Sequence, residues 1–62
     1  MKNRIVLYIL TQEGQQRKEL VNFNKVDRTW MNGELLIRIQ CDNAFYYFPV
    51  QTTIIAEVNI CD

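Results

Sequence analysis

The dipeptide Asn32-Gly33 constrains the fold of this chain more than any other feature. Both residues accept the positive backbone angles of a two-residue hairpin turn, so the sequence predicts a tight turn here. In residues 34–41, which follow, apolar and polar side chains alternate with the period of a strand that buries one face. Asp42-Asn43 is a second candidate for a turn of the same length. We therefore expect a central strand between two hairpin turns.

The second turn determines which side chains face each other across the hairpin. If it contains two residues, the pairs on the predicted core face are Cys41 with Ala44, Ile39 with Tyr46 and Ile37 with Phe48, and the pairs on the other face are Gln40 with Phe45 and Arg38 with Tyr47. That other face cannot belong to the core of the same domain, yet it carries a leucine and two aromatic residues. It is the predicted binding site, and its residues are Leu36, Arg38, Phe45 and Tyr47.

Three more segments have strand patterns. Residues 5–10 are an unbroken apolar run rich in β-branched residues, which indicates a strand covered on both faces. Residues 26–31 lead into the first turn and complete the first hairpin. Residues 54–60 alternate, and the side chains predicted to point inward are Ile54, Ala56, Val58 and Ile60.

The predicted core includes three aromatic residues, Trp30, Tyr46 and Phe48. Trp30 stands one step before the first turn and pairs across it with Leu35 on the face expected to be buried. Arg28 falls on the same face as Trp30, so this strand must be short or must contain a bulge that redirects the arginine.

Residues 16–24 fit two structures. As a helix, the segment begins with good helix formers and places Leu20 and Phe23 three apart on one face. As a strand, Val21 and Phe23 share one face. The strand is favoured because its neighbours are strands and because so short a helix would be marginal alone. The alternative is an α+β fold with a short helix at 15–23.

Residues 1–62 are therefore expected to form a single all-β domain, a small curled antiparallel sheet or barrel of five to six short strands. The segment Phe45-Tyr46-Tyr47-Phe48-Pro49-Val50, followed by a strand, resembles the end of Src-homology-3-like barrels, in which a Phe-Pro step leads through one tight turn to the last strand. The early acidic-aromatic loop of that family, its adjacent tryptophans and the glycine before Phe-Pro are absent. Neither its proline-rich ligand nor its binding residues carry over to this chain.

The composition argues against catalysis, a metal and a cofactor. The chain has no histidine, which removes the commonest general base, and its two glycines cannot form a phosphate-binding loop. Two cysteines, Cys41 and Cys61, cannot complete a four-ligand zinc site within one chain. We expect both to be small apolar residues, with a disulfide between them as the less favoured alternative.

Length and charge bear on partners and location. A core of this size supplies only about 3–5 kcal/mol of stability, so association with another chain would help. Residues 5–10 are too short an apolar run for a signal peptide or a membrane span, which predicts a cytoplasmic, reduced protein without a membrane partner. The net charge is zero, which gives no general reason to bind nucleic acid or an anionic membrane.

Three functions fit these features. The favoured one is a non-enzymatic protein that binds another protein and itself, as a homo-oligomer, because unmatched apolar surface marks an interface. The predicted contact between copies includes Leu36, Arg38 and Tyr47, with Phe45 beside them. One alternative is capture of a small nucleotide-like ligand between subunits. The other is single-stranded nucleic-acid binding. The residues that would stack on bases or contact the backbone in that case are Tyr47, Phe45, Trp30, Arg38, Lys25 and Arg28.

The size of the chain suggests a biological setting. A short protein that begins at its own Met1 and carries no targeting signal is typical of accessory proteins from viruses or mobile elements. Such proteins commonly act as inhibitors, by blocking a host factor or sequestering a signal. We therefore expect an accessory protein that inhibits a host factor.

Overall fold

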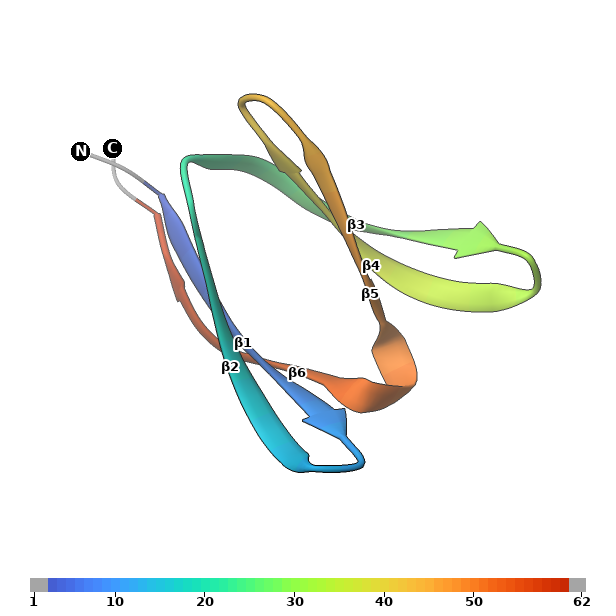
Figure 1. Cartoon of the computed structure of the whole chain (residues 1–62). Coiled ribbons are helices and arrows are strands. Elements are labelled where there is room, and N and C mark those ends of the chain that lie inside the picture. The colour runs from blue at the N-terminus through green and yellow to red at the C-terminus, as the bar shows by residue number, and fades with distance from the viewer. Residues whose placement is uncertain (1–2, 61–62) are drawn as a thin grey trace.

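The computed structural model describes residues 3–60, which form six strands and one short 3-10 helix (Figure 1). The elements are β1 (Arg4–Thr11), β2 (Gly14–Val21), β3 (Phe23–Met31), β4 (Glu34–Cys41), β5 (Phe45–Pro49), η1 (Val50–Thr52) and β6 (Thr53–Asn59). They make two antiparallel three-stranded sheets, in the orders β2-β1-β6 and β3-β4-β5. The predicted fold class is confirmed. The alternative helix at 15–23 is wrong, because that segment lies in β2 and at the start of β3.

A single residue, Asn22, turns the chain from the first sheet into the second. Its φ of 63° lies in the left-handed region, where asparagine is one of the few residues found without strain. The Asn22 N–H donates to the carbonyl oxygen of Asn3 at 2.8 Å, and the Asn3 side-chain amide donates to the carbonyl oxygen of Phe23 at 3.0 Å. Asn3, which directly precedes β1, therefore holds both sides of this bend.

Both predicted turns of the central hairpins are present. Asn32 and Gly33 have φ of 54° and 79°, the two positive angles of a type I′ turn. At the second turn, the Cys41 N–H donates to the Ala44 carbonyl oxygen at 2.9 Å. The predicted register is confirmed, and its pairs are Trp30 with Leu35, Ile37 with Phe48, Ile39 with Tyr46, Arg38 with Tyr47 and Gln40 with Phe45.

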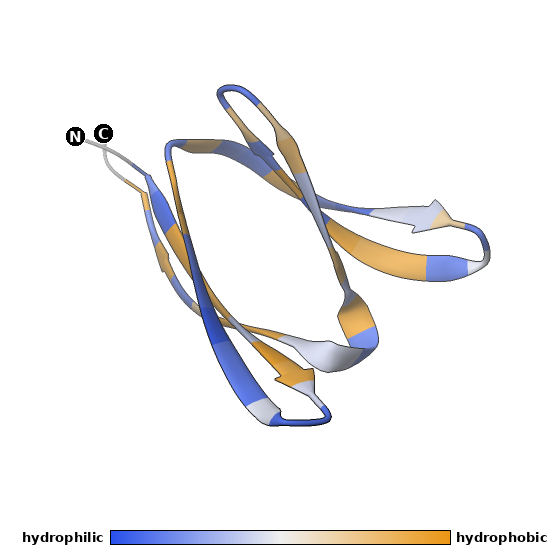
Figure 2. Cartoon of the chain, viewed as in Figure 1, coloured by the Kyte–Doolittle hydropathy of each residue, from blue (hydrophilic) through white to orange (hydrophobic). Residues whose placement is uncertain are grey.

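The core lies between the two sheets. Ile5 and Leu7 of β1 and Ile39 of β4 are completely buried. The other members of the buried cluster are Leu20, Phe23 and Ile37, and the half-buried residues packed against it are Val26, Cys41, Phe48 and Val50. The predicted core position of Phe48 is therefore confirmed. Figure 2 shows the apolar character concentrated on β1 and β4, whereas most of β2 is hydrophilic.

The apolar run at 5–10 predicts cover on both faces of β1, and the outer face is covered at Val6 but not at Leu10, which is 60% exposed. Val6 points away from the core but is only 2% exposed. It pairs with Glu19 on β2 and with Glu57 on β6, and the Arg4 guanidinium bridges both carboxylates at 3.1 Å. The side chains of this ion-pair network lie over Val6 and exclude water from it.

The core positions predicted for Trp30 and Tyr46 are wrong. Trp30 stands on the core-facing side of β3 but is 68% exposed, because its end of the β3–β4 hairpin extends beyond the first sheet (Figure 1). Arg28 shares this face and is exposed for the same reason. Tyr46 also points to the core side but is 37% exposed, since it stands at the rim.

The inward alternation predicted for residues 54–60 is correct for Val58, which pairs with Ile5, but wrong for Ile54. The register skips Ala56, because Val6 pairs with Glu57 and Leu7 pairs with Ile55, so β6 contains a bulge. Ile55 and Val58, rather than Ile54, consequently share the inner side with Leu7 and Ile5. Even these two remain exposed, because the second sheet does not reach over β6. Cys61 lies outside the described residues, and so does any disulfide that it forms with Cys41.

Candidate protein-interaction surface

The four residues of the predicted binding site lie on the outer face of the β3-β4-β5 sheet. Ile37 and Ile39 point into the core, so their neighbours on β4 point away from it. Arg38 is paired with Tyr47, and Gln40 is paired with Phe45, which places both aromatic residues on that side. We call this surface the outer aromatic face, and its residues are Leu36, Arg38, Phe45 and Tyr47.

The four residues differ in how much contact they offer. Leu36 is only 9% exposed, so it offers a partner little contact. Phe45 is 54% exposed and Tyr47 is 43% exposed. The accessible part of the outer aromatic face therefore consists of these two rings and the guanidinium beside them.

A bidentate ion pair holds Arg38 in place. Its Nε and Nη2 atoms donate to the two carboxylate oxygens of Asp27 at 2.9 and 2.6 Å. The Arg38 Cζ atom lies 5.9 Å from the centre of the Phe45 ring, within range of a cation–π contact. The hydrogen bond from Arg38 lowers the pKa of Asp27, and the same hydrogen bond raises the pKa of Arg38. The Lys25 amine lies 3.8 Å from the same carboxylate.

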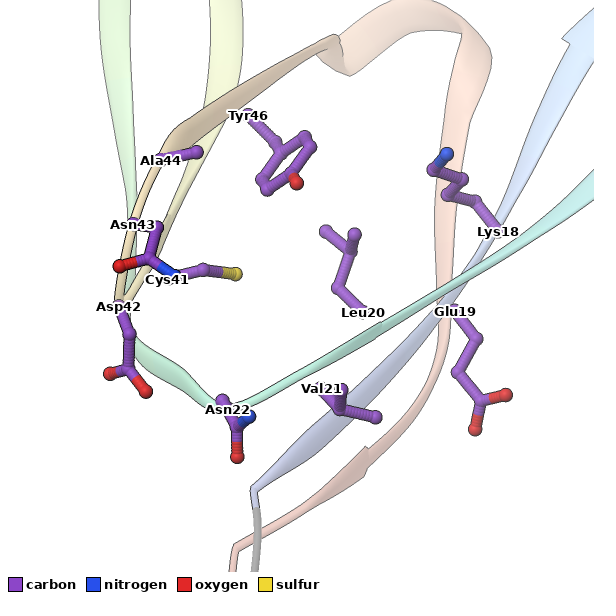
Figure 3. A pocket seen from close by; sticks show the side chains of 10 residues that line it. All are labelled: Lys18, Glu19, Leu20, Val21, Asn22, Cys41, Asp42, Asn43, Ala44 and Tyr46. Atoms are coloured by element: carbon purple, nitrogen blue, oxygen red, sulfur yellow. The ribbon is translucent and has the colours of Figure 1, made fainter.

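A cleft of about 410 Å³ opens at the junction of the two sheets, between the end of β2 and the β4–β5 turn (Figure 3). We call it the junction cleft. Tyr46 and Leu20 point toward one another across it, and the thiol of Cys41 points into the same space beside them. Burial raises the pKa of that thiol, and the charge of Asp42 adds to the effect, so Cys41 is a poor nucleophile.

A second concavity, of about 420 Å³, lies at the tip of the β3–β4 hairpin. Its wall is formed by the exposed ring of Trp30 and by Leu35, and η1 closes it from the other side through Val50 and Gln51. Glu34 contributes its charged group. Sequence analysis missed this groove, because the face that forms it has the pattern of a buried face.

In residues 3–60, no group of three or more His, Cys, Asp or Glu side chains is placed to hold a metal ion. Within the same range, no helix has the length and apolar content needed to cross a membrane. Comparisons with family models, with curated proteins and with solved structures give no match for this chain.

Proposed function

We propose that this chain is a non-enzymatic binding protein and that its outer aromatic face contacts a partner protein. One observation carries the proposal: two exposed rings, Phe45 and Tyr47, flank an arginine that an ion pair holds in one position. Tyrosine and arginine are enriched among the residues that dominate binding energies at protein interfaces. A sheet face with this composition and without cover supports contact with another protein.

The ion pair with Asp27 makes Arg38 suitable for such a contact. Ordering a flexible side chain at an interface costs roughly 0.5–1.5 kcal/mol, and much of that cost is already met in the free protein. A guanidinium has five N–H donors, and Asp27 occupies two of them, so the others can reach a partner. The partner surface that fits presents an apolar side chain to the two rings and a carbonyl or carboxylate oxygen to Arg38.

The placement of the aromatic residues argues against a nucleic-acid-binding surface. Trp30 lies on the core-facing side of its sheet, whereas Phe45 and Tyr47 lie on the outer side, so the three rings form no common platform. Arg38 is already neutralised by Asp27. A strand of nucleic acid along this sheet would meet two rings and one exposed ammonium group, that of Lys25.

One observation favours the nucleotide-like ligand as a second candidate. Lys18 and Tyr46 border the junction cleft, so an amine and an aromatic ring stand near one another at a concave site. Glu19 also borders the cleft, but its carboxylate is 3.1 Å from Arg4 on the outer face. A small anion with a planar ring is the kind of ligand that such a cleft suits.

The proposed mode of action is that of a protein without enzymatic activity. A protein that only binds must act by occupying the surface of its partner. We therefore place it among small accessory proteins that inhibit or sequester a host factor, as viruses and mobile elements encode, working in the cytoplasm.

The test combines native mass spectrometry with two matched variants. The protein is purified with its partners from the cells in which it acts, and hydrogen exchange of the complex is compared with that of the free chain. We expect a bound protein and slower exchange in residues 36–38 and 45–47. Tyr47→Glu should remain folded and lose the partner, because a charge at a contact costs more in binding than in folding.

Val21→Glu provides the control, because Val21 is similarly exposed at 48% but lies in β2, on the other sheet. It should keep the partner. Binding that survives Tyr47→Glu would overturn the proposal. A small ligand in the native mass spectrum, released by Lys18→Ala, would establish the second candidate instead. Salt-dependent binding to oligonucleotides would establish the nucleic-acid alternative.

A further inference from the structure

The four strand edges that the two sheets leave open differ in their protection. An open edge offers unpaired backbone N–H and C=O groups to any other strand, and proteins usually blunt it with charged residues, proline or a bulge. The open edges belong to β2 and β6 in one sheet and to β3 and β5 in the other. Their sequences divide them into two pairs.

Two of the edges are protected by charge. β2 carries Arg17, Lys18 and Glu19 in its eight residues. β3 carries three charged residues in nine and also has a bulge between Phe23 and Lys25. Their exposed apolar residues lie at the strand ends, Val21 in β2 and Trp30 and Met31 in β3, whereas the charged residues occupy the middle of each edge.

The other two edges carry little charge, although β6 has the bulge at Ala56 described above. β5 has no charged residue, and its only blunting feature is Pro49 at its end. β6 has one charged residue, Glu57, whose carboxylate is held by Arg4 at 3.1 Å and by the Asn59 amide at 2.9 Å. No residue of β6 is buried. Its isoleucines and valine remain uncovered on both faces, with Ile54 at 59%, Ile55 at 42% and Val58 at 46% exposed.

The chain is more extended than a compact domain of the same length. A compact domain of this length has a radius of gyration of about 10.6 Å. The value for this chain is 11.8 Å, and its extents are 35 × 25 × 16 Å. The excess fits two sheets that overlap only in part, with the β3–β4 hairpin extending beyond the first sheet (Figure 1).

From these observations we infer that the open edge of β6 pairs with the open edge of β5 in a second copy of this chain. The side chains of the two edges suit each other, because β5 is aromatic and β6 is β-branched. Aromatic and β-branched residues opposite one another are among the favourable cross-strand pairs. The pairing brings no two charged residues of like sign together, since β5 has none.

The contact is heterologous, because two different edges meet in it. Each copy pairs its β6 edge with the β5 edge of one neighbour and its β5 edge with the β6 edge of another. Such contacts continue from copy to copy until they close into a ring or extend as a filament. Self-association through these edges leaves the outer aromatic face accessible, because side chains on a sheet face stand perpendicular to the edge that pairs. The inference does not depend on the partner protein proposed above.

Sedimentation and native mass spectrometry of three single variants test this pairing. The parent should have a mass of several chains. Ile54→Lys and Phe45→Lys should each give a folded single chain, because a lysine on an edge is a natural block to pairing. Leu10→Lys is the matched control, since Leu10 is as exposed as Ile54, at 60%, but lies in the central strand β1. It should assemble like the parent.

Mixing the two edge variants identifies the geometry. The Ile54→Lys chain keeps an intact β5 edge, and the Phe45→Lys chain keeps an intact β6 edge, so an equimolar mixture should form a one-to-one dimer and nothing larger. A parent that stays a single chain at all concentrations would overturn the inference. So would a Phe45→Lys variant that still associates with itself, because that would show pairing between two β6 edges.

Discussion

The two sheets have equal numbers of strands but treat their outer faces in opposite ways. In the β2-β1-β6 sheet, Arg4 bridges carboxylates on both neighbouring strands, and Val6 beneath them is 2% exposed. In the β3-β4-β5 sheet, the Arg38 and Asp27 pair covers only part of the face and leaves Phe45 and Tyr47 in solvent. The chain itself closes the first outer face around Val6, although Leu10 and Ile54 on that face stay exposed, and it leaves the two rings of the second face open.

The difference lies in which strands supply the carboxylates. Arg4 stands in the central strand β1 and finds an acid on each side, so its network spans all three strands. Arg38 also stands in a central strand, but its acid lies only on β3, and its other neighbour β5 offers aromatic rings. An arginine with one carboxylate and one aromatic neighbour has donors left for a partner, which is the physical basis of the proposed function.

The largest expected effect comes from placing a charge on the closed face. Val6→Asp puts a carboxylate under the Arg4 network, between Glu19 and Glu57, where desolvation costs several kcal/mol per ion. That cost is comparable to the roughly 3–5 kcal/mol that a core of this size supplies, so the variant should be unfolded by circular dichroism.

The equivalent change on the open face should be tolerated. Tyr47→Glu places the same charge on a side chain that is 43% exposed, and the variant should melt cooperatively. If Val6→Asp melted near the parent temperature, the first face would be as open as the second. The contrast between the sheets would then be lost.

A smaller effect is expected from the acids of the two faces at low pH. The hydrogen bond from Arg38 lowers the pKa of Asp27 from an ordinary 3.8, so this pair stabilises the fold above that pH and ceases to as pH falls through the lower, folded pKa. Asp27→Asn should therefore melt below the parent at neutral pH. The difference should disappear in acid, where the parent carboxylate is protonated as well.

Glu57→Gln tests the same pH dependence of stability on the other sheet. The hydrogen bond from Asn59 and the charge of Arg4 lower the pKa of Glu57, which gives the same sign of pH dependence. Its loss should matter less than that of Asp27, because Arg4 keeps Glu19 as a partner. A pH-independent deficit in both variants would show that lost packing, rather than ion pairing, sets their stability.

Sequence reasoning succeeded where the information is local. Asn32-Gly33 determines its own turn, and a two-residue link after Cys41 determines every pair between β4 and β5, including the four residues of the outer aromatic face. The same reasoning could not find that Leu36 is already covered or that Asp27 holds Arg38 by two hydrogen bonds. These depend on side-chain positions across strands rather than on the pattern along one strand.

The errors concern how far the two sheets overlap. In β6, adjacent Ile54 and Ile55 allow either residue to point inward, and only pairing with β1 reveals the bulge at Ala56. Whether an inward residue is also covered depends on the length of the opposite sheet. No periodicity within residues 54–60 carries that information, and the open edge of β6 was missed for this reason.

The burial of Trp30 also depends on how far the opposite sheet reaches, which its sequence pattern does not reveal. Its replacement gives the smallest expected effect on stability. A core tryptophan truncated to alanine costs about 3–5 kcal/mol, but a change at an exposed position is usually within about 0.5 kcal/mol. At 68% exposure, Trp30→Ala should unfold at nearly the urea concentration of the parent. Because the chain has one tryptophan, its fluorescence reports on this site alone. Emission from the folded protein should resemble that of the urea-unfolded chain, and a marked blue shift on folding would mean that the tip of the β3–β4 hairpin is covered after all.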